Sequence, residues 1–262
     1  MALIRLLFTA NGSWTVPARV YSVRAYLLGG GGGGGGGRLG ATTNATGGAG
    51  GGGAKLVTAL VTVVPGAVHP ITIGLGGTAG AVDTTGGDGG LTEFGSFGSL
   101  ALAKGAQGGG RAKTPPGAGN YIVPGGHPVP IGFQEGPLLL GTGPYIRIPG
   151  QGGAGATNLS IPGTDSDPRY GAATAVADQG AFGAFTGFGN PGGSGGASEW
   201  PGGQGGAGGD GSDNVFVVAT AGSPGVLGSG GGGGGSGDIG IGGTPAAGGA
   251  GGNGLLVLEW EA

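Results

Sequence analysis

The chain has 262 residues, of which 79 are glycine and 17 are proline, and it contains no cysteine. Its formal net charge is −3 and its ten Lys and Arg residues are scattered, so it lacks the basic stripe that nucleic-acid binding requires. Without cysteine, neither disulfides nor thiolate metal sites can stabilise the fold. So much glycine usually indicates disorder, but only 9% of the residues are charged and the mean hydropathy is +0.18, which favours a folded chain.

We expect no signal peptide at the beginning of the sequence. The apolar run from Met1 to Phe8 is too short for a signal peptide and leads directly into strand-like sequence. No stretch approaches the roughly eighteen consecutive apolar residues of a membrane span, so no membrane insertion is expected.

Eight segments have the composition of β-strands. Polar and apolar residues alternate from Ser22 to Leu27, the pattern of a half-buried strand, whereas Leu56 to Val64 is apolar on both faces, which predicts a central strand. No segment has helical periodicity, so the sequence predicts an all-β fold with no α-helix and a β-sandwich-like frame. The eight segments are 3–10, 13–16, 20–28, 54–64, 68–74, 91–103, 214–220 and 255–259.

Between the strands, glycine recurs with a period of three. Residues 202–211 read Gly-Gly-Gln, Gly-Gly-Ala, Gly-Gly-Asp, Gly, residues 248–254 follow the same rule, and residues 192–197 add two triplets. A polyproline II helix has three residues per turn and no internal hydrogen bonds. Two of its three edges are then bare backbone that can hydrogen-bond to neighbouring segments, while the third carries Gln, Ala, Asp or Asn. The sequence therefore predicts a bundle of polyglycine II helices beside the β frame.

Two alternatives concern this glycine. A collagen helix is excluded because no proline lies inside the triplet runs. A flexible linker stays open for Gly29–Gly37 and Gly230–Gly235, where no triplet can be distinguished.

The composition divides the chain into three parts. Residues 1–110 form the first half of a glycine-rich β domain, and residues 201–262 supply its polyglycine II triplets and closing strands. Residues 111–200 form an insertion that is rich in proline and aromatic residues and reads as ordered loop.

A family resemblance is carried by the segments that flank the glycine runs. These segments are Phe8-Thr9-Ala10-Asn11-Gly12-Ser13-Trp14-Thr15-Val16-Pro17, Val23 to Leu28, Ala54-Lys55-Leu56-Val57, Ile71 to Gly77, Thr92-Glu93-Phe94-Gly95 and Gly251 to Trp260. Together they resemble the glycine-rich domain of bacteriophage tail-fibre and adhesin proteins, over roughly the first 110 residues and the last few tens.

The resemblance implies a function and a location. It implies a virion structural protein, a tail-fibre or tail-tip adhesin that is made in the host cytoplasm and binds a bacterial surface protein or polysaccharide. Other virion proteins would be its partners, and homo-oligomerisation is compatible with it. The alternative is a purely structural virion or filament subunit, such as a capsid decoration or a self-assembling scaffold, with no receptor of its own. Ice binding is disfavoured because threonines such as Thr42-Thr43 are too few and too irregular.

Candidate receptor-binding residues lie in the insertion, because polyglycine offers little chemistry and the strands form the core. Tyr and Arg dominate binding hot spots, and these residues stand in loop-like sequence. They are Tyr121, His127, Tyr145, Arg147, Arg169 and Tyr170. A second set, Phe182, Phe185, Phe188 and Trp200, has its phenylalanines spaced by three and reads as a structural aromatic stripe or, alternatively, as a displayed docking surface.

Motifs that would indicate an enzyme are weak. Gly193-Ser194-Gly195 fits a serine-hydrolase elbow, but serine within polyglycine produces it by chance, and only His69 and His127 could act as the base. The stretch 208–216 fits one calcium nonapeptide, whereas such sites need consecutive copies. We therefore expect no enzymatic activity, no metal and no cofactor.

Overall fold

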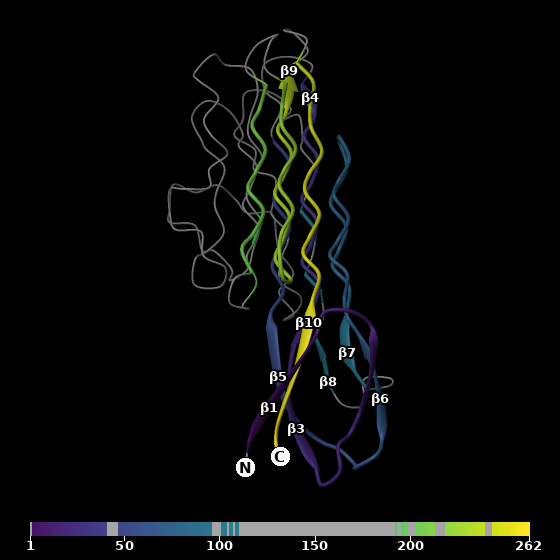
Figure 1. The fold of residues 1–262 in the computed structure, drawn as a ribbon. Helices are drawn as coiled ribbons and strands as arrows, with labels where there is room; N and C mark the ends of the chain where they lie inside the picture. Colours follow the sequence, from purple (N-terminus) through teal and green to yellow (C-terminus); the bar gives the residue numbers. More distant parts are fainter. Residues whose placement is uncertain are drawn as a thin grey trace, which may run out of the picture.

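The computed structural model describes residues 2–40, 47–95, 101–103, 105–106, 108–109, 192, 195–196, 198, 203–212, 218–238 and 243–262. Within these residues the fold is all-β, with strands in two antiparallel sheets and no helix. The molecule has two parts (Figure 1). The base holds the two sheets and both ends of the chain, and a bundle of glycine-rich segments, the glycine bundle, extends from it.

The base consists of two four-stranded sheets. The first has the order β1 (Leu3–Phe8), β10 (Leu255–Glu261), β3 (Ser22–Leu28), β5 (Leu56–Thr62). The second has the order β2 (Gly12–Thr15), β6 (Val68–Thr72), β7 (Thr92–Phe94), β8 (Ala101–Ala103). A short parallel pair, β4 (Leu39–Gly40) with β9 (Gly237–Asp238), lies at the far end of the glycine bundle (Figure 1).

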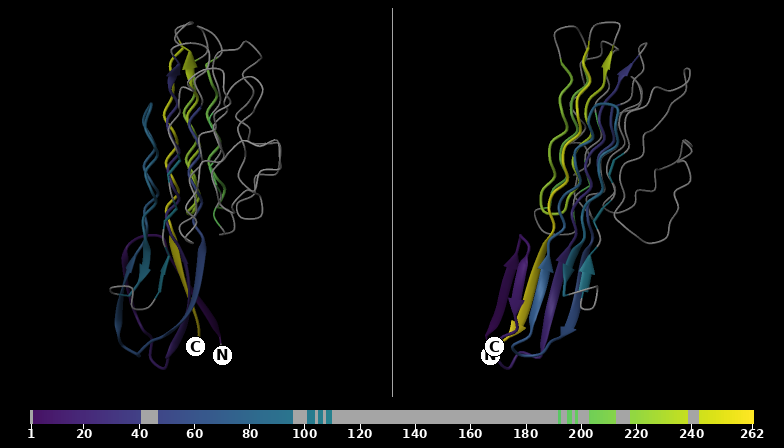
Figure 2. Two further views of the ribbon diagram at one scale, coloured as in Figure 1. Left: turned by 180° about the vertical axis from the view of Figure 1, so that it is seen from behind. Right: turned by 90° about the vertical axis from the view of Figure 1, so that its right-hand side faces the viewer.

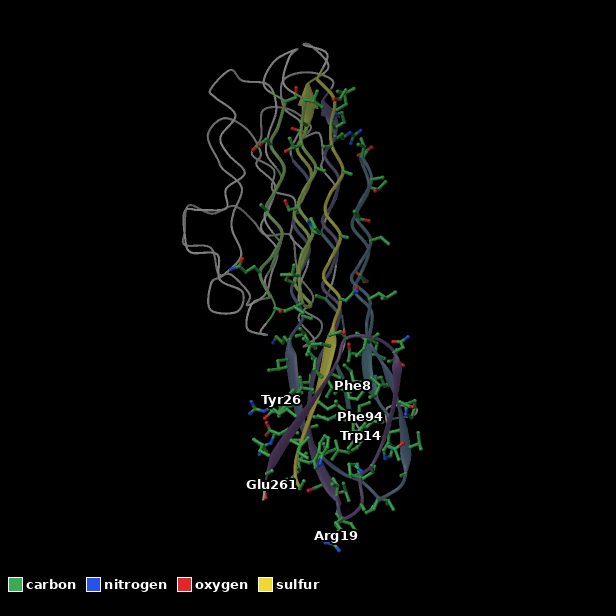
Figure 3. The ribbon with its side chains drawn as sticks, viewed as in Figure 1. Phe8, Trp14, Arg19, Tyr26, Phe94 and Glu261 are labelled. Carbon is green, nitrogen blue, oxygen red and sulfur yellow. The ribbon has the colours of Figure 1, made fainter. Side chains whose placement is uncertain are left out.

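The sheets enclose one apolar core. The expected alternation in β3 is confirmed, since Val23, Ala25 and Leu27 are all at most 1% exposed. The Trp14 ring of the second sheet packs at a tilted angle against Trp260 of the first sheet, with a centroid distance of 5.4 Å, and against Phe94 of its own sheet at 6.0 Å. The Trp14–Trp260 contact thus joins the two layers. Figure 3 shows Phe8, Trp14 and Phe94 directed into this space.

Three strand predictions need correction. β5 is an edge strand, with Leu60 77% exposed, and not a central one. The apolar residues on its second face are explained in part by Leu56, which packs against a small cluster with Leu28 and Leu255 beside the glycine bundle. The segment 91–103 forms two strands, β7 and β8. Residues 218–220 form no strand, since the Thr220 N–H donates to Asp210 within the glycine bundle.

The glycine segments run side by side from the base (Figure 2) and are joined by backbone hydrogen bonds with a period of three residues. The segment 29–37 lies at their centre. Its residues 30, 33 and 36 donate to segment 84–90, residues 31, 34 and 37 to segment 246–252, and residues 32 and 35 to segment 49–52. All three of these acceptor segments run antiparallel to it, as the descending acceptor numbers show.

The carbonyl groups of the central segment follow the same rule. Residues 31, 34 and 37 accept from segment 77–83, residues 32 and 35 from segment 231–234, and residues 30 and 33 from Ala106 and Gly109. These donors run parallel to it. The central segment is therefore bonded to six neighbours, which pairs the N–H groups of residues 30–37 and the carbonyl groups of residues 30–35 and 37 without water.

Glycine is required in this bundle because the neighbouring segments leave no room for a side chain. At Gly31 an added Cβ would lie 1.9 Å from the Ser229 carbonyl oxygen, and at Gly34 it would lie 2.0 Å from that of Gly232. Positive φ angles occur among the described glycines at Gly66, Gly95 and Gly228, outside the central segment. The linker alternative for 29–37 and 230–235 is therefore wrong, because both runs are buried and hydrogen-bonded.

Candidate functional site

The candidate receptor-binding residues and the aromatic stripe lie outside the described residues. This applies to Tyr121, His127, Tyr145, Arg147, Arg169 and Tyr170, to Phe182, Phe185, Phe188 and Trp200, and to Ser194. The insertion 111–200 that contains them stays a prediction. The described part of the chain instead supplies the scaffold, its far end and its outer surfaces.

The junction between the base and the glycine bundle is organised by Thr92. This residue is fully buried at the start of β7. Its hydroxyl donates to the Leu28 carbonyl at 2.6 Å and accepts from the Gly74 N–H at 3.0 Å. Leu28 ends a strand of the first sheet and Gly74 begins a glycine segment, so one hydroxyl joins both sheets to the bundle.

Gly228 closes the other side of the junction. Its φ of 76° lies in the left-handed region, and an added Cβ would come within 2.6 Å of the Leu28 side chain. Its carbonyl accepts from the Ala54 N–H at 2.8 Å. The glycine bundle is thus packed on a fully buried leucine of the base.

The far end of the glycine bundle carries ordinary side chains. Arg38 Nε lies 3.7 Å from Asp83 Oδ1, and both side chains are 38% exposed. Leu39 in β4 and Val82 are partly exposed beside them. This end lies opposite to the end of the molecule that holds both chain termini (Figure 1). We name these four residues the distal patch.

The sides of the bundle present one residue in three. Gln204 and Ala207 are exposed on one segment, and Ala250 and Asn253 on another, while Gly206 between the first pair is buried. These exposed positions are the non-glycine residues of the sequence triplets. Asn253 also accepts a hydrogen bond from the Gly76 N–H at 2.8 Å, so its side chain extends the backbone network.

The outer face of the first sheet holds a row of polar residues. Arg5 Nε donates to Glu259 Oε2 at 2.6 Å, and the Tyr26 hydroxyl donates to Glu259 Oε1 at 3.5 Å. The hydrogen bond with Tyr26, followed by the charges of Tyr26 and Glu259, raises the pKa of Arg24. Among these residues no nucleophile is paired with a base.

His69 lies in the base. Its ring meets Phe94 edge-on at a centroid distance of 5.6 Å, and its Nε2 is buried without a hydrogen-bond partner. The ring is therefore a component of the core packing.

The described residues show neither metal ligands nor a spanning helix. They contain no cluster of three or more His, Cys, Asp or Glu side chains that could hold a metal ion. In the same residues no helix is long and apolar enough to cross a membrane.

Two features define the class of protein. An all-β base encloses an aromatic core, and a bundle of glycine-rich segments stands on it, held by backbone hydrogen bonds. The family model of the glycine-rich domain matches residues 9–261, so the chain belongs to this family. No curated protein matches the chain.

The structural contacts that the sequence did not predict are those of Thr92 and Gly228 and the Arg38–Asp83 pair. Each joins residues at least 45 positions apart or depends on a φ angle. Gly228 alone had a local signal, because it follows Val226-Leu227 and precedes a serine and a long glycine run, where a turn is expected.

Proposed function

We propose that the chain is a phage virion structural protein, a tail-fibre or tail-tip adhesin that binds a bacterial surface protein or polysaccharide and has no enzymatic activity. The proposal places it in the virion with other tail proteins as partners. Its support is the resemblance of the strand and glycine segments to tail-fibre glycine-rich domains, together with the geometry of the scaffold.

The observation that carries the proposal is the construction of the glycine bundle. Its central segment is hydrogen-bonded to six neighbours, and the bundle extends away from the base that holds both chain ends. Because the backbone supplies the cohesion, the exposed edges and the distal patch can vary without loss of the scaffold. A rigid scaffold with replaceable side chains at the far end is well suited to display a recognition surface.

We further infer that the glycine segments are polyglycine II helices. The hydrogen bonds repeat every three residues, they join different segments, and the segments contain neither α-helix nor, along most of their length, strand. A helix of three residues per turn directs successive residues to three edges, which accounts for the three donor directions of residues 30, 31 and 32.

Adsorption to cells tests the adhesin proposal. The labelled full chain is incubated with a panel of bacteria, before and after protease or periodate treatment, so that a protein receptor is distinguished from a polysaccharide. The double variant Tyr121→Ala/Tyr145→Ala should lose at least about tenfold in adsorption, the effect of truncating two hot spots, with an unchanged melting temperature. The matched control Tyr21→Ala, at a residue 66% exposed in the base, should adsorb like the parent chain.

Two outcomes would overturn the proposal. If antibody labelling of purified particles finds the protein over the capsid and no cell in the panel binds it, the purely structural subunit replaces the adhesin. Reproducible ester hydrolysis that is lost in Ser194→Ala would disprove the absence of enzymatic activity.

A further inference from the structure

Strand β1 is an unprotected edge of the first sheet. It pairs with β10 on one side, and among the described residues no strand pairs with its other side. Its sequence is Leu-Ile-Arg-Leu-Leu-Phe. Proteins normally shorten, charge or bulge such edges, because free N–H and C=O groups invite another strand.

The apolar residues of β1 are exposed on both faces of the sheet. On the outer face Leu3 and Leu7 are 57% and 58% exposed, and on the inner face Ile4 and Leu6 are 38% and 39% exposed. Arg5 is the one charged residue of the strand, and its charge is compensated within the sheet by the 2.6 Å contact with Glu259. The Glu259 side chain is only 10% exposed, so this contact holds Arg5 along the sheet.

The direction of the free backbone groups follows from the pairing with β10. Ala2 and Ala262 exchange both backbone hydrogen bonds. Hydrogen-bonded pairs alternate along an antiparallel ladder, so residues 4, 6 and 8 also point their backbone groups towards β10. The N–H and C=O groups of Leu3, Arg5 and Leu7 therefore point away from the sheet.

The other edges of the base differ in kind. β2 has four residues, and Ser13 and Thr15 are its outward-facing positions. The outer face of β5 carries Thr58 and Thr62 on either side of the exposed Leu60. β2 is short, and threonines flank the one strongly exposed leucine of β5, whereas β1 exposes four large apolar residues around its one charged residue.

We propose that β1 pairs with β1 of a second copy of the chain, forming a two-fold symmetric dimer with a continuous eight-stranded sheet. The pairing is antiparallel. Leu3 lies opposite the partner's Leu7, Arg5 opposite the partner's Arg5, and Leu7 opposite the partner's Leu3. On the inner face Ile4 lies opposite the partner's Leu6.

Three features select this register. It places the outward-pointing residues 3, 5 and 7 opposite one another, so that all their free backbone groups are paired. It also sets apolar side chains opposite apolar ones on both faces of the sheet. A shift by two residues in either direction would set Arg5 against leucine and leave one leucine opposite a residue beyond the strand.

The charges are consistent with the same register. Across the dimer the outer-face row would read Glu259, Arg5, the partner's Arg5, the partner's Glu259. Each arginine is then flanked by its own carboxylate, which offsets the repulsion between the two guanidinium groups. The β1 strand is therefore complementary to itself, because it is apolar on both faces and the charge of its central arginine is compensated.

The dimer is tested by measuring mass in solution. By light scattering during size exclusion, the full chain at micromolar concentration should have twice the mass of one chain. Leu3→Lys/Leu7→Lys places lysine opposite lysine twice and should weaken the dimer by at least about 100-fold, giving a monomer. Leu3→Lys/Leu7→Glu places lysine opposite glutamate only in this register and should restore the dimer.

Leu60→Lys is the matched control, since Leu60 lies on the outer face of the opposite edge strand and is 77% exposed. It should remain dimeric. Circular dichroism of each variant confirms folding, which these exposed positions should not disturb. A monomeric parent chain overturns the proposal, as does a dimer that persists in Leu3→Lys/Leu7→Lys. Failure of the glutamate variant to restore the dimer disproves the register.

Discussion

The base and the glycine bundle exclude water by opposite means. The base is filled by large side chains, with Phe94, Leu27 and Leu258 fully buried between the sheets. The bundle is filled by backbone, and its central residues Gly31 and Gly34 have no room for a Cβ. The difference shows that dense packing depends on filled volume and satisfied hydrogen bonds, and that side chains are one of two ways to obtain it.

The two regions should therefore respond differently to mutation. The base loses stability when atoms are removed, since a cavity is left behind. The bundle loses stability when atoms are added, because the neighbouring backbone cannot move without breaking hydrogen bonds to other segments.

The largest effect is expected for Gly34→Ala at the centre of the bundle. The added methyl group would lie 2.0 Å from the Gly232 carbonyl oxygen and 2.4 Å from its carbon. We expect destabilisation by more than about 4 kcal/mol or failure to fold, measured by chemical denaturation. Gly12→Ala, where an added Cβ meets no atom within 4 Å, should change stability by less than about 0.5 kcal/mol. A mild effect at Gly34 would mean that the central segment is not held by its six neighbours.

A smaller effect, about 3 kcal/mol, is expected for Gly205→Val at the periphery of the bundle. There the added Cβ would lie 1.9 Å from the Gly195 carbonyl oxygen, but the outer segment has fewer neighbours to displace. Gln204→Val, on the exposed edge next to it, should cost less than about 0.5 kcal/mol. Equal shifts in melting temperature for the two variants would contradict the polyglycine II interpretation.

The smallest effect concerns the boundary between the regions. Thr92→Val keeps the shape but removes the hydroxyl, leaving the Gly74 N–H and the Leu28 carbonyl without this partner, and should cost about 2 kcal/mol in urea denaturation. Thr92→Ser keeps the hydroxyl and loses one methyl group, so it should lower the free energy of unfolding by about 1 kcal/mol. If serine proves as damaging as valine, the hydroxyl does not join the base to the bundle.

Much of this contrast was readable in the sequence. The alternation from Ser22 to Leu27 predicted the buried face of β3, and the triplets predicted which positions, such as Gln204, would be exposed. The orientation of the central run Gly29–Gly37 could not be predicted, because nine identical residues do not show which of them face which neighbour. Which residues face which neighbour is determined by segments such as 84–90 and 246–252, which are distant in the sequence.

The same limit applies to the edges and the junction. Apolar residues on both faces predicted a central position for β5, whereas the strand lies at an edge and Leu56 packs at the junction. The partner of the Thr92 hydroxyl, Leu28, is 64 residues away, and no local pattern indicates it. Composition thus predicts which segments have so few side chains that they can pack backbone to backbone. The topology of the fold determines which segments they pack against.

The period of three in the hydrogen bonds also restricts how the length of this protein can change. A single inserted residue within 29–37 would turn every later donor by a third of a turn and direct it at the wrong neighbour. In the proposed polyglycine II geometry, three inserted residues would keep each donor on its own neighbour and lengthen the segment by one turn, roughly 9 Å. We therefore expect the glycine bundle to tolerate insertions and deletions of three residues, or multiples of three, better than those of one or two.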